Sequence, residues 1–198
     1  MAKIPFPAGA MITRSDLEMV HPGQVVLRSI YGAGSQVMGR GPGHWRGRLE
    51  IGETDRASDG ERRAVEAFLS RLRGALNTFE APIERPGSGS LAAGTNLTVS
   101  TATLVSGVLT VAVTGAETGL AAGDYVRIGD RLYQLTSDHK GSQFTVEPPA
   151  VPPAPAAGKA VVWENVTCLA RMASEDGAGG GWTPDFGGPW TIDWEEAV

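Results

Sequence analysis

Apolar and polar residues alternate over short segments along most of this chain, a pattern typical of β-strands with one buried face. In the first half this pattern predicts strands over residues 24–30 and 46–51. Further strands are predicted over residues 97–103, 108–114, 125–128, 131–137, 143–148, 159–163 and 167–173. In the tail, Trp190, Ile192 and Trp194 alternate with polar residues, which predicts a terminal strand that packs two tryptophans into a core. The chain is therefore predicted to be mainly β.

One helix interrupts the strands, predicted over about residues 59–74. Ser58 and Glu61 have the spacing of a capping box, and Gly74 is a natural C-terminal stop. An apolar stripe repeats at helical spacing between them, made by Ala64, Val65, Phe68, Leu69 and Leu72. This stripe must cover a sheet or the edge of a barrel.

Two segments of unusual composition divide the chain. Residues 86–94 are rich in glycine and serine, as in a flexible linker, and residues 148–158 are rich in proline and alanine. We predict that residues 1–90 and 159–198 form one β domain with the helix, and that residues 91–158 form an inserted small β domain, a barrel or sandwich.

Two stretches are rich in glycine: residues 32–47 are predicted to be a mobile loop or the tip of a long hairpin, and residues 177–181 are predicted to be a second loop. Each has a tryptophan in or beside it, and an aromatic side chain in a glycine-rich loop is suited to anchoring a subunit interface. The predicted interface residues are Trp45, Gly41, Gly43, Trp182 and Gly180, with the N-terminal arm as a further contact. On this hypothesis Trp45→Ala weakens assembly and leaves the monomer folded.

The charge and composition exclude several classes of protein. With 17 basic and 22 acidic residues the net charge is -5, which disfavours general attraction to nucleic acid or anionic membranes. No apolar stretch approaches the roughly 18 residues of a membrane span, and the N-terminus lacks the apolar region of a secretion signal. Synthesis and folding in the cytoplasm are therefore expected. The single cysteine, Cys168, excludes an internal disulfide and is expected to be a buried small apolar residue.

No catalytic, cofactor-binding or metal-binding residue is predicted, and the chain is not expected to be an enzyme. The three histidines, His21, His44 and His139, lack metal-ligand spacing, and no phosphate-binding loop or nucleophile elbow is present. Two carboxylate pairs, 175–176 and 195–196, resemble acid/base pairs only in composition, because adjacent strand residues point to opposite faces.

Part of the chain resembles a module of siphophage tail proteins. The resemblance lies in residues 120–136 (LAAGDYVRIGDRLYQLT), 144–149 (FTVEPP) and 159–163 (KAVVW). Residues 170–173 (ARMA) and 191–197 (TIDWEEA) are similar to the closing segment of distal tail (Dit-like) proteins. The resemblance covers about the last 80 residues well, and the first half by element order.

This resemblance implies a structural virion protein at the tail tip or baseplate, made in the cytoplasm of the bacterial host. Its fold would be a tail-tube-like β-sandwich or split barrel with one flanking helix and an inserted small β-barrel. It would form a homohexameric ring that joins the tail tube protein to the baseplate hub protein, with DNA only passing through the lumen. The alternatives are a tail-tube or tail-terminator protein, and a glycan-binding module of the adsorption apparatus that uses exposed tryptophans.

Overall fold

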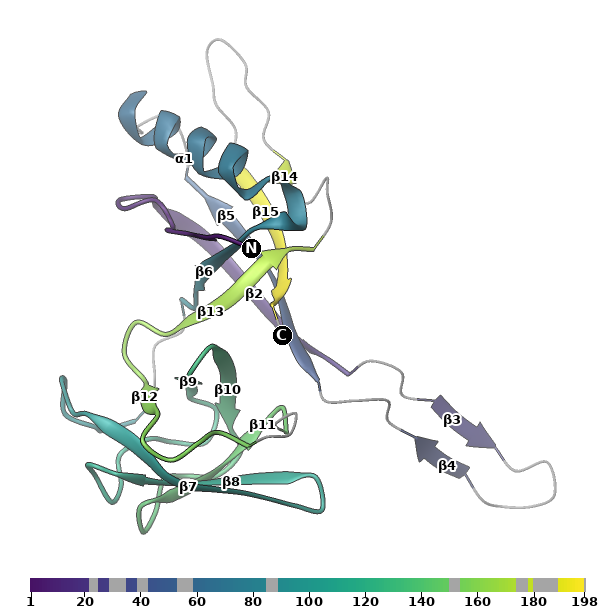
Figure 1. Cartoon of the computed structure of the whole chain (residues 1–198), viewed down its shortest axis with the longest axis vertical. Coiled ribbons are helices and arrows are strands. Elements are labelled where there is room, and N and C mark those ends of the chain that lie inside the picture. The colour runs from purple at the N-terminus through teal and green to yellow at the C-terminus, as the bar shows by residue number, and fades with distance from the viewer. Residues whose placement is uncertain are drawn as a thin grey trace.

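The computed structural model describes residues 1–21, 25–28, 35–38, 43–52, 59–84, 89–149, 154–173, 178–179 and 189–197. These residues are mainly β, as the sequence predicts, and form a mixed sheet, a closed barrel, a separate two-stranded pair and one α-helix. Figure 1 shows the helix and the mixed sheet in the upper part of the molecule and the barrel below them.

The mixed sheet gathers strands from both ends of the chain. Its order is β1 (Lys3–Ile4), β6 (Thr78–Pro82), β13 (Thr167–Met172), β15 (Trp190–Glu196), β5 (His44–Ile51) and β2 (Ile12–Val20), and β14 (Ala178–Gly179) also pairs with β15. Among the strand pairs formed by the described residues of this sheet, β1–β6 is the only parallel one. The terminal strand predicted from its alternating tryptophans therefore lies inside the sheet, where Trp194 is fully buried.

Helix α1 (Asp59–Leu72) covers one face of this sheet (Figure 1). Val65, Phe68 and Leu72 are buried, and the Phe68 ring meets Phe79 of β6 edge-on at 5.6 Å. The helix ends where Arg73 adopts the left-handed conformation (φ 51°), and a 3-10 turn, η1 (Gly74–Leu76), follows. The predicted helix is confirmed, although Ser58 of its expected capping box lies outside the described residues.

The barrel has its own core. Its strand order is β10 (Arg131–Leu135), β11 (Gln143–Glu147), β8 (Val108–Thr114), β7 (Leu97–Val105), β12 (Ala160–Val162) and β9 (Tyr125–Ile128). Alternate residues point inward, among them the buried Val111, Val126 and Phe144. Strand β12 was expected to belong to the first domain, but it pairs with β7 and β9 and closes the barrel.

Of the two alternatives for residues 32–47, the structure fits the hairpin, because they include β4 (Ser35–Met38), which pairs with a preceding strand, and the start of β5. Strands β1, β2, β6 and β14 were not predicted. The predicted strand over 24–30 is present as β3 (Val25–Arg28), which pairs with β4.

Candidate functional site

The barrel and the sheet meet at a buried junction centred on Trp45, in β5. Its side chain is only 2% exposed, and its indole Nε1 donates a hydrogen bond of 2.9 Å to the carbonyl oxygen of Leu132, in β10 of the barrel. Its ring also meets Tyr125 of β9 edge-on at 5.5 Å. Trp45 therefore joins the two parts of a single chain.

A buried carboxylate completes this junction. Glu196, at the end of β15, is 2% exposed, and its two oxygens accept hydrogen bonds from the backbone amides of Trp45 (3.2 Å) and Leu132 (3.0 Å). Burial raises the pKa of Glu196, and the two amides and the nearby Arg131 guanidinium partly offset that effect. One side chain thus bonds a strand of the sheet and a strand of the barrel at the same time.

Two arginines of the barrel reach the sheet as well. Arg127 Nη1 contacts both Glu80 Oε1 and Thr167 Oγ1 at 2.6 Å, and Arg131 Nη2 donates to the carbonyl oxygen of Gly43 at 2.8 Å. Hydrogen bonds from Lys3 and Arg127 lower the pKa of Glu80. The junction combines an apolar centre with charged hydrogen bonds, so the barrel is held in one orientation on the sheet.

Two of the predicted interface residues, Trp45 and Gly43, lie among the described residues, and both make contacts within their own chain. Trp45 is buried at the junction, and Gly43 is buried beside the end of β2, where an added Cβ would lie 3.2 Å from the carbonyl oxygen of Val20. Gly41, Gly180 and Trp182 lie outside the described residues. The N-terminal arm pairs with β6 of its own sheet through β1. A role for these residues between subunits stays a prediction.

The face of the sheet opposite the buried residues is densely charged. It carries five basic side chains, Lys3, Arg14, Arg46, Arg48 and Arg171, and six carboxylates, Asp16, Glu18, Glu50, Glu80, Asp193 and Glu195. They pair across strands, for example Arg46 with Glu18 and Arg48 with Asp193, both at 2.7 Å, and Arg171 with Glu195 at 2.8 Å. Because these side chains are largely exposed, each pair adds little stability, and the face is suited to water.

Strand β2 is the long outer strand at one edge of this sheet. Among the described residues it pairs only with β5, over the whole length from Ile12 to Val20. An outer strand presents unpaired backbone amides and carbonyls, which are a template for a further strand. At the opposite edge, β1 has only two residues.

Strands β3 and β4 form a hairpin that stands away from both the sheet and the barrel (Figure 1). In the described part of the chain they pair only with each other, over four residues each. A two-stranded hairpin without further packing is marginally stable in water. Such an element gains stability when it lies against another surface.

A cleft of about 720 Å³ lies between the barrel and the sheet. Its walls include the apolar or aromatic side chains of Ile83, Leu91, Leu120, Tyr125, Trp163 and Val166. Trp163 is half-buried, with its Nε1 donating to the carbonyl oxygen of Thr95 at 2.9 Å. In the described residues Trp45 and Trp194 are buried, which leaves Trp163 and the half-buried Trp190 as the accessible tryptophans for stacking on a sugar.

The remaining candidates from the sequence do not converge on a catalytic site within the described residues. Glu195 lies on the charged face and Glu196 is buried, as expected for adjacent strand residues. The other carboxylate pair, residues 175–176, lies outside the described residues. Cys168 is buried as predicted, and burial raises the pKa of its thiol well above the ordinary value. In the described ranges no cluster of three or more potential ligands is placed to hold a metal ion, and no helix there could span a membrane.

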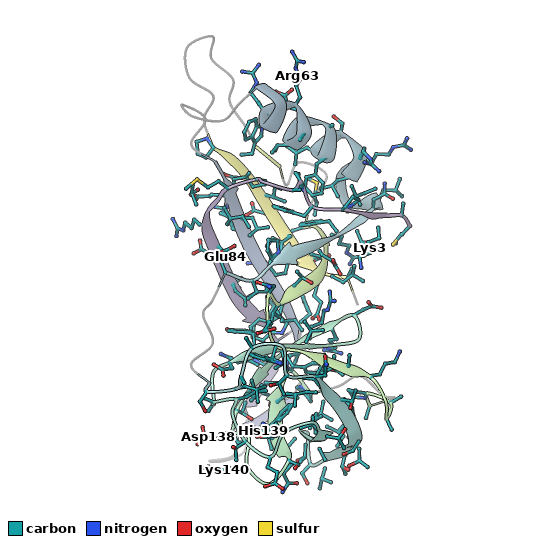
Figure 2. The ribbon with its side chains drawn as sticks, turned by 90° about the vertical axis from the view of Figure 1, so that its left-hand side faces the viewer. Lys3, Arg63, Glu84, Asp138, His139 and Lys140 are labelled. Atoms are coloured by element: carbon teal, nitrogen blue, oxygen red, sulfur yellow. The ribbon has the colours of Figure 1, made fainter. Side chains whose placement is uncertain are left out.

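His139 is the buried histidine, and sequence reasoning did not distinguish it from the other two. It is 1% exposed, meets the Phe144 ring edge-on at 5.5 Å, and neither ring nitrogen has a hydrogen-bond partner in the described part of the chain. Asp138 and Lys140 flank it on the barrel (Figure 2) and form an ion pair of 3.2 Å. Burial lowers the pKa of His139, because the charged imidazolium loses its hydration.

We expect this histidine to make the barrel sensitive to acid. A folded-state pKa below the unfolded value of about 6.5 means that the unfolded chain binds the proton first, so stability falls as the pH drops below about 6.5. Thermal melts of wild type and His139→Gln between pH 8 and pH 5 check this expectation. The wild type should lose more stability over this range than the variant, and parallel curves would show that His139 does not titrate on unfolding.

No protein-family model matches the chain, and no curated protein sequence matches it either.

Proposed function

We propose that this chain is a structural subunit that assembles into a ring at the distal end of a siphophage tail, between the tail tube and the baseplate hub. The observation that carries the proposal is a sheet covered by a helix on one face, densely charged on the other, and open at the long strand β2. The finer description of the first domain as a tube-like β-sandwich or split barrel is part of this proposal.

The charged face fits the wall of a water-filled channel. A sheet that lines such a channel has a helix and core on its outer side and solvated side chains on its inner side. The six carboxylates of the charged face lie beside Lys3 and four arginines of the sheet and Arg127 of the barrel, so the face carries little net charge, while the whole chain carries -5. A lining whose basic side chains are already paired with carboxylates, in a chain of net negative charge, offers little attraction to the phosphates of DNA, so DNA passes through the lumen without adhering.

The edges of the sheet and the β3–β4 hairpin fit the needs of a ring. A closed ring is built from heterologous contacts, in which one surface of a subunit meets a different surface of the next. The open edge of β2 is suited to strand pairing, and the projecting hairpin gains stability by lying on a neighbour. The number of six copies comes from the resemblance to distal tail proteins.

Two alternative functions are compatible with this architecture or with part of it. A tail-tube or tail-terminator protein would use the same sheet, and copy number in the virion separates these from a distal ring, since a tube protein occurs in many stacked rings. A glycan-binding module is favoured by the junction cleft, where Trp163 and Tyr125 are aromatic surfaces for a sugar ring. Specific retention on a host envelope glycan would support that rival.

Removal of the projecting hairpin tests the proposal. Val20 and His44 are paired partners at the ends of β2 and β5, so an Asn-Gly turn in place of residues 22–42 closes these strands and keeps Gly43, whose carbonyl oxygen accepts from Arg131. We expect this variant to keep the sheet and barrel and to lose ring assembly. Light scattering and negative-stain images measure assembly, and circular dichroism checks the fold.

The wild type in the same buffer is the reference, and a variant with alanine at the exposed Ser70 of α1 controls for surface substitution. Wild-type rings of about six copies with a monomeric hairpin variant would support the proposal. Hairpin-deleted protein that forms the same rings would contradict the role of the hairpin, and absence of the chain from purified tails would contradict the function.

A further inference from the structure

The segment that forms the projecting β3–β4 hairpin carries only positive charge. Residues 22–42, which contain both strands, include two arginines, Arg28 and Arg40, and no lysine, histidine, aspartate or glutamate. Their net charge is therefore +2. The rest of the chain holds the other 15 basic residues and all 22 acidic residues, a net charge of -7. The hairpin of one copy and the remainder of another thus have opposite charge, which favours their association.

The same segment is rich in large apolar side chains. They make up seven of its 21 residues: Val25, Val26, Leu27, Ile30, Tyr31, Val37 and Met38. In the described part of the chain β3 and β4 pair only with each other, and a hairpin without further packing buries little apolar surface. A surface that receives this hairpin should therefore combine apolar side chains with unpaired carboxylates.

The junction cleft combines these two properties. Its volume of about 720 Å³ is lined by apolar and aromatic side chains and by the carboxylates of Glu84, Asp124 and Glu164, and the described residues of its walls include no lysine, arginine or histidine. Glu84 and Glu164 are exposed, and within the described ranges neither forms an ion pair. On the charged face of the sheet, by contrast, carboxylates already pair with arginines. The cleft is the apolar surface that still offers carboxylates to a basic partner.

The aromatic and acidic groups of the cleft together suit an arginine side chain. A guanidinium donates hydrogen bonds to carboxylates and stacks on aromatic rings. Glu84 comes shortly after β6 of the sheet and Glu164 after β12 of the barrel, so the two carboxylates come from both parts of the chain; Figure 2 shows Glu84 on the sheet side, above the barrel. Trp163 is half-buried, and the hydrogen bond from its Nε1 to Thr95 holds its ring in place.

We propose that the β3–β4 hairpin of one copy binds in the junction cleft of a second copy of this chain, with its arginines against the cleft carboxylates. The hairpin lies away from its own cleft: Figure 1 shows the hairpin on one side of the junction and β6, β12 and the start of β13, which bound the cleft, on the other. The contact joins two different surfaces, and such contacts generate rings when the rotation closes. The inference rests on the self-assembly in the proposed function and names the surface that receives the hairpin.

Binding of the hairpin arginines to DNA phosphates is a weaker explanation of its charge. Surfaces that bind nucleic acid carry clustered lysine and arginine, because affinity grows with the number of phosphates that are neutralised. Two arginines among seven large apolar residues are closer to the composition of a protein interface, where apolar and aromatic residues and arginine are enriched.

Charge reversal on each side of the contact tests it. One full-length variant combines Arg28→Glu with Arg40→Glu, and the other combines Glu84→Lys with Glu164→Lys. Each variant alone brings like charges together, so we expect the concentration needed for self-association to rise by at least about tenfold. In an equimolar mixture every hairpin can meet a cleft of opposite charge, and assembly should return to within about threefold of wild type. Light scattering measures assembly, and circular dichroism checks the fold.

A matched control places the same change of charge elsewhere on the barrel. Glu117 and Asp130 are exposed and do not line the cleft, so Glu117→Lys combined with Asp130→Lys should assemble like the wild type. A mixture of the two charge-reversed variants that assembles no better than either alone would overturn the contact, as would an equal loss in the control or a wild type that stays monomeric. Normal assembly of Arg28→Glu with Arg40→Glu, together with lost retention on double-stranded DNA, would assign the hairpin to DNA instead.

The contact and the proposed function fail separately. Rings that the hairpin deletion abolishes, but that neither charge-reversed variant weakens, would leave the proposed function standing and remove the cleft as the receiving surface. Rescue of assembly in the mixture, in a protein absent from purified tails, would leave the contact standing and remove the function.

Discussion

Trp45→Ala is expected to lower the free energy of unfolding by about 4 kcal/mol, because large-to-small changes at buried aromatics cost roughly 3–5 kcal/mol. The side chain is 2% exposed and fills the centre of the junction between sheet and barrel. Its loss also removes the hydrogen bond to the carbonyl oxygen of Leu132, which then lies buried without its donor. A loss of this size is a large fraction of the free energy of unfolding of a typical domain, which is about 5–15 kcal/mol.

Urea denaturation followed by circular dichroism measures this effect. Trp45→Phe is the matched control, since it keeps an aromatic ring against Tyr125 and loses the indole donor, and we expect an intermediate loss. From the sequence, Trp45→Ala was expected to weaken assembly without affecting the monomer. Burial of the side chain changes that expectation, and an unfolding curve equal to the wild type would restore it.

The strands that the sequence predicts best are those of the barrel. In β8 and β9 every second residue is apolar and buried, and the predicted bounds agree with the structure. Each of these strands has one face on the barrel core and one in water, so the periodicity of two appears directly in the sequence. The helix was equally clear, since its apolar stripe meets the sheet and its other side is solvated.

The sheet was harder to predict because its edges do not follow that rule. In β2 the charged residues Arg14, Asp16 and Glu18 lie on the exposed face, opposite Glu50, Arg48 and Arg46 of β5, and no residue of β2 is fully buried. Strand β6 is short, and its pairing partners β1 and β13 lie far away in sequence. Local composition carries little information about strands that are specified by such distant pairing.

The junction illustrates the same limit at the level of single residues. Trp45 lies in a glycine-rich stretch, so its sequence context suggests a loop or a hairpin tip, yet it is the second residue of a long strand of the sheet. Glu196 appeared only as half of an adjacent carboxylate pair. Its role depends on two amides that are 151 and 64 residues away along the chain, and no local pattern reveals that contact.

Glu196→Ala is expected to destabilise the protein by about 3 kcal/mol and to loosen the barrel from the sheet. The substitution leaves the buried amides of Trp45 and Leu132 without an acceptor, and each unsatisfied donor costs roughly 1–3 kcal/mol, of which the removal of a buried charge returns a part. Chemical denaturation measures the stability. Limited proteolysis of the connections between the two parts of the chain measures the loosening, and the charged-face neighbour Glu195→Ala is the control.

The pH dependence of Glu196→Gln separates the charge of this side chain from its hydrogen bonds. Burial raises the folded-state pKa of Glu196 above its ordinary value of 4.5, so the native protein binds this proton more tightly than the unfolded chain. The stability linked to this proton is present below about pH 4.5 and is lost as the pH rises through the folded-state value. The glutamine variant does not titrate and keeps one acceptor oxygen. We therefore expect the stability deficit of Glu196→Gln relative to wild type to be greatest near pH 4.5 and to shrink as the pH rises towards 7. A deficit that stays constant over this range would mean that the pKa of Glu196 is the same in the folded and the unfolded chain. The contribution of Glu196 to the junction would then come from its hydrogen bonds alone.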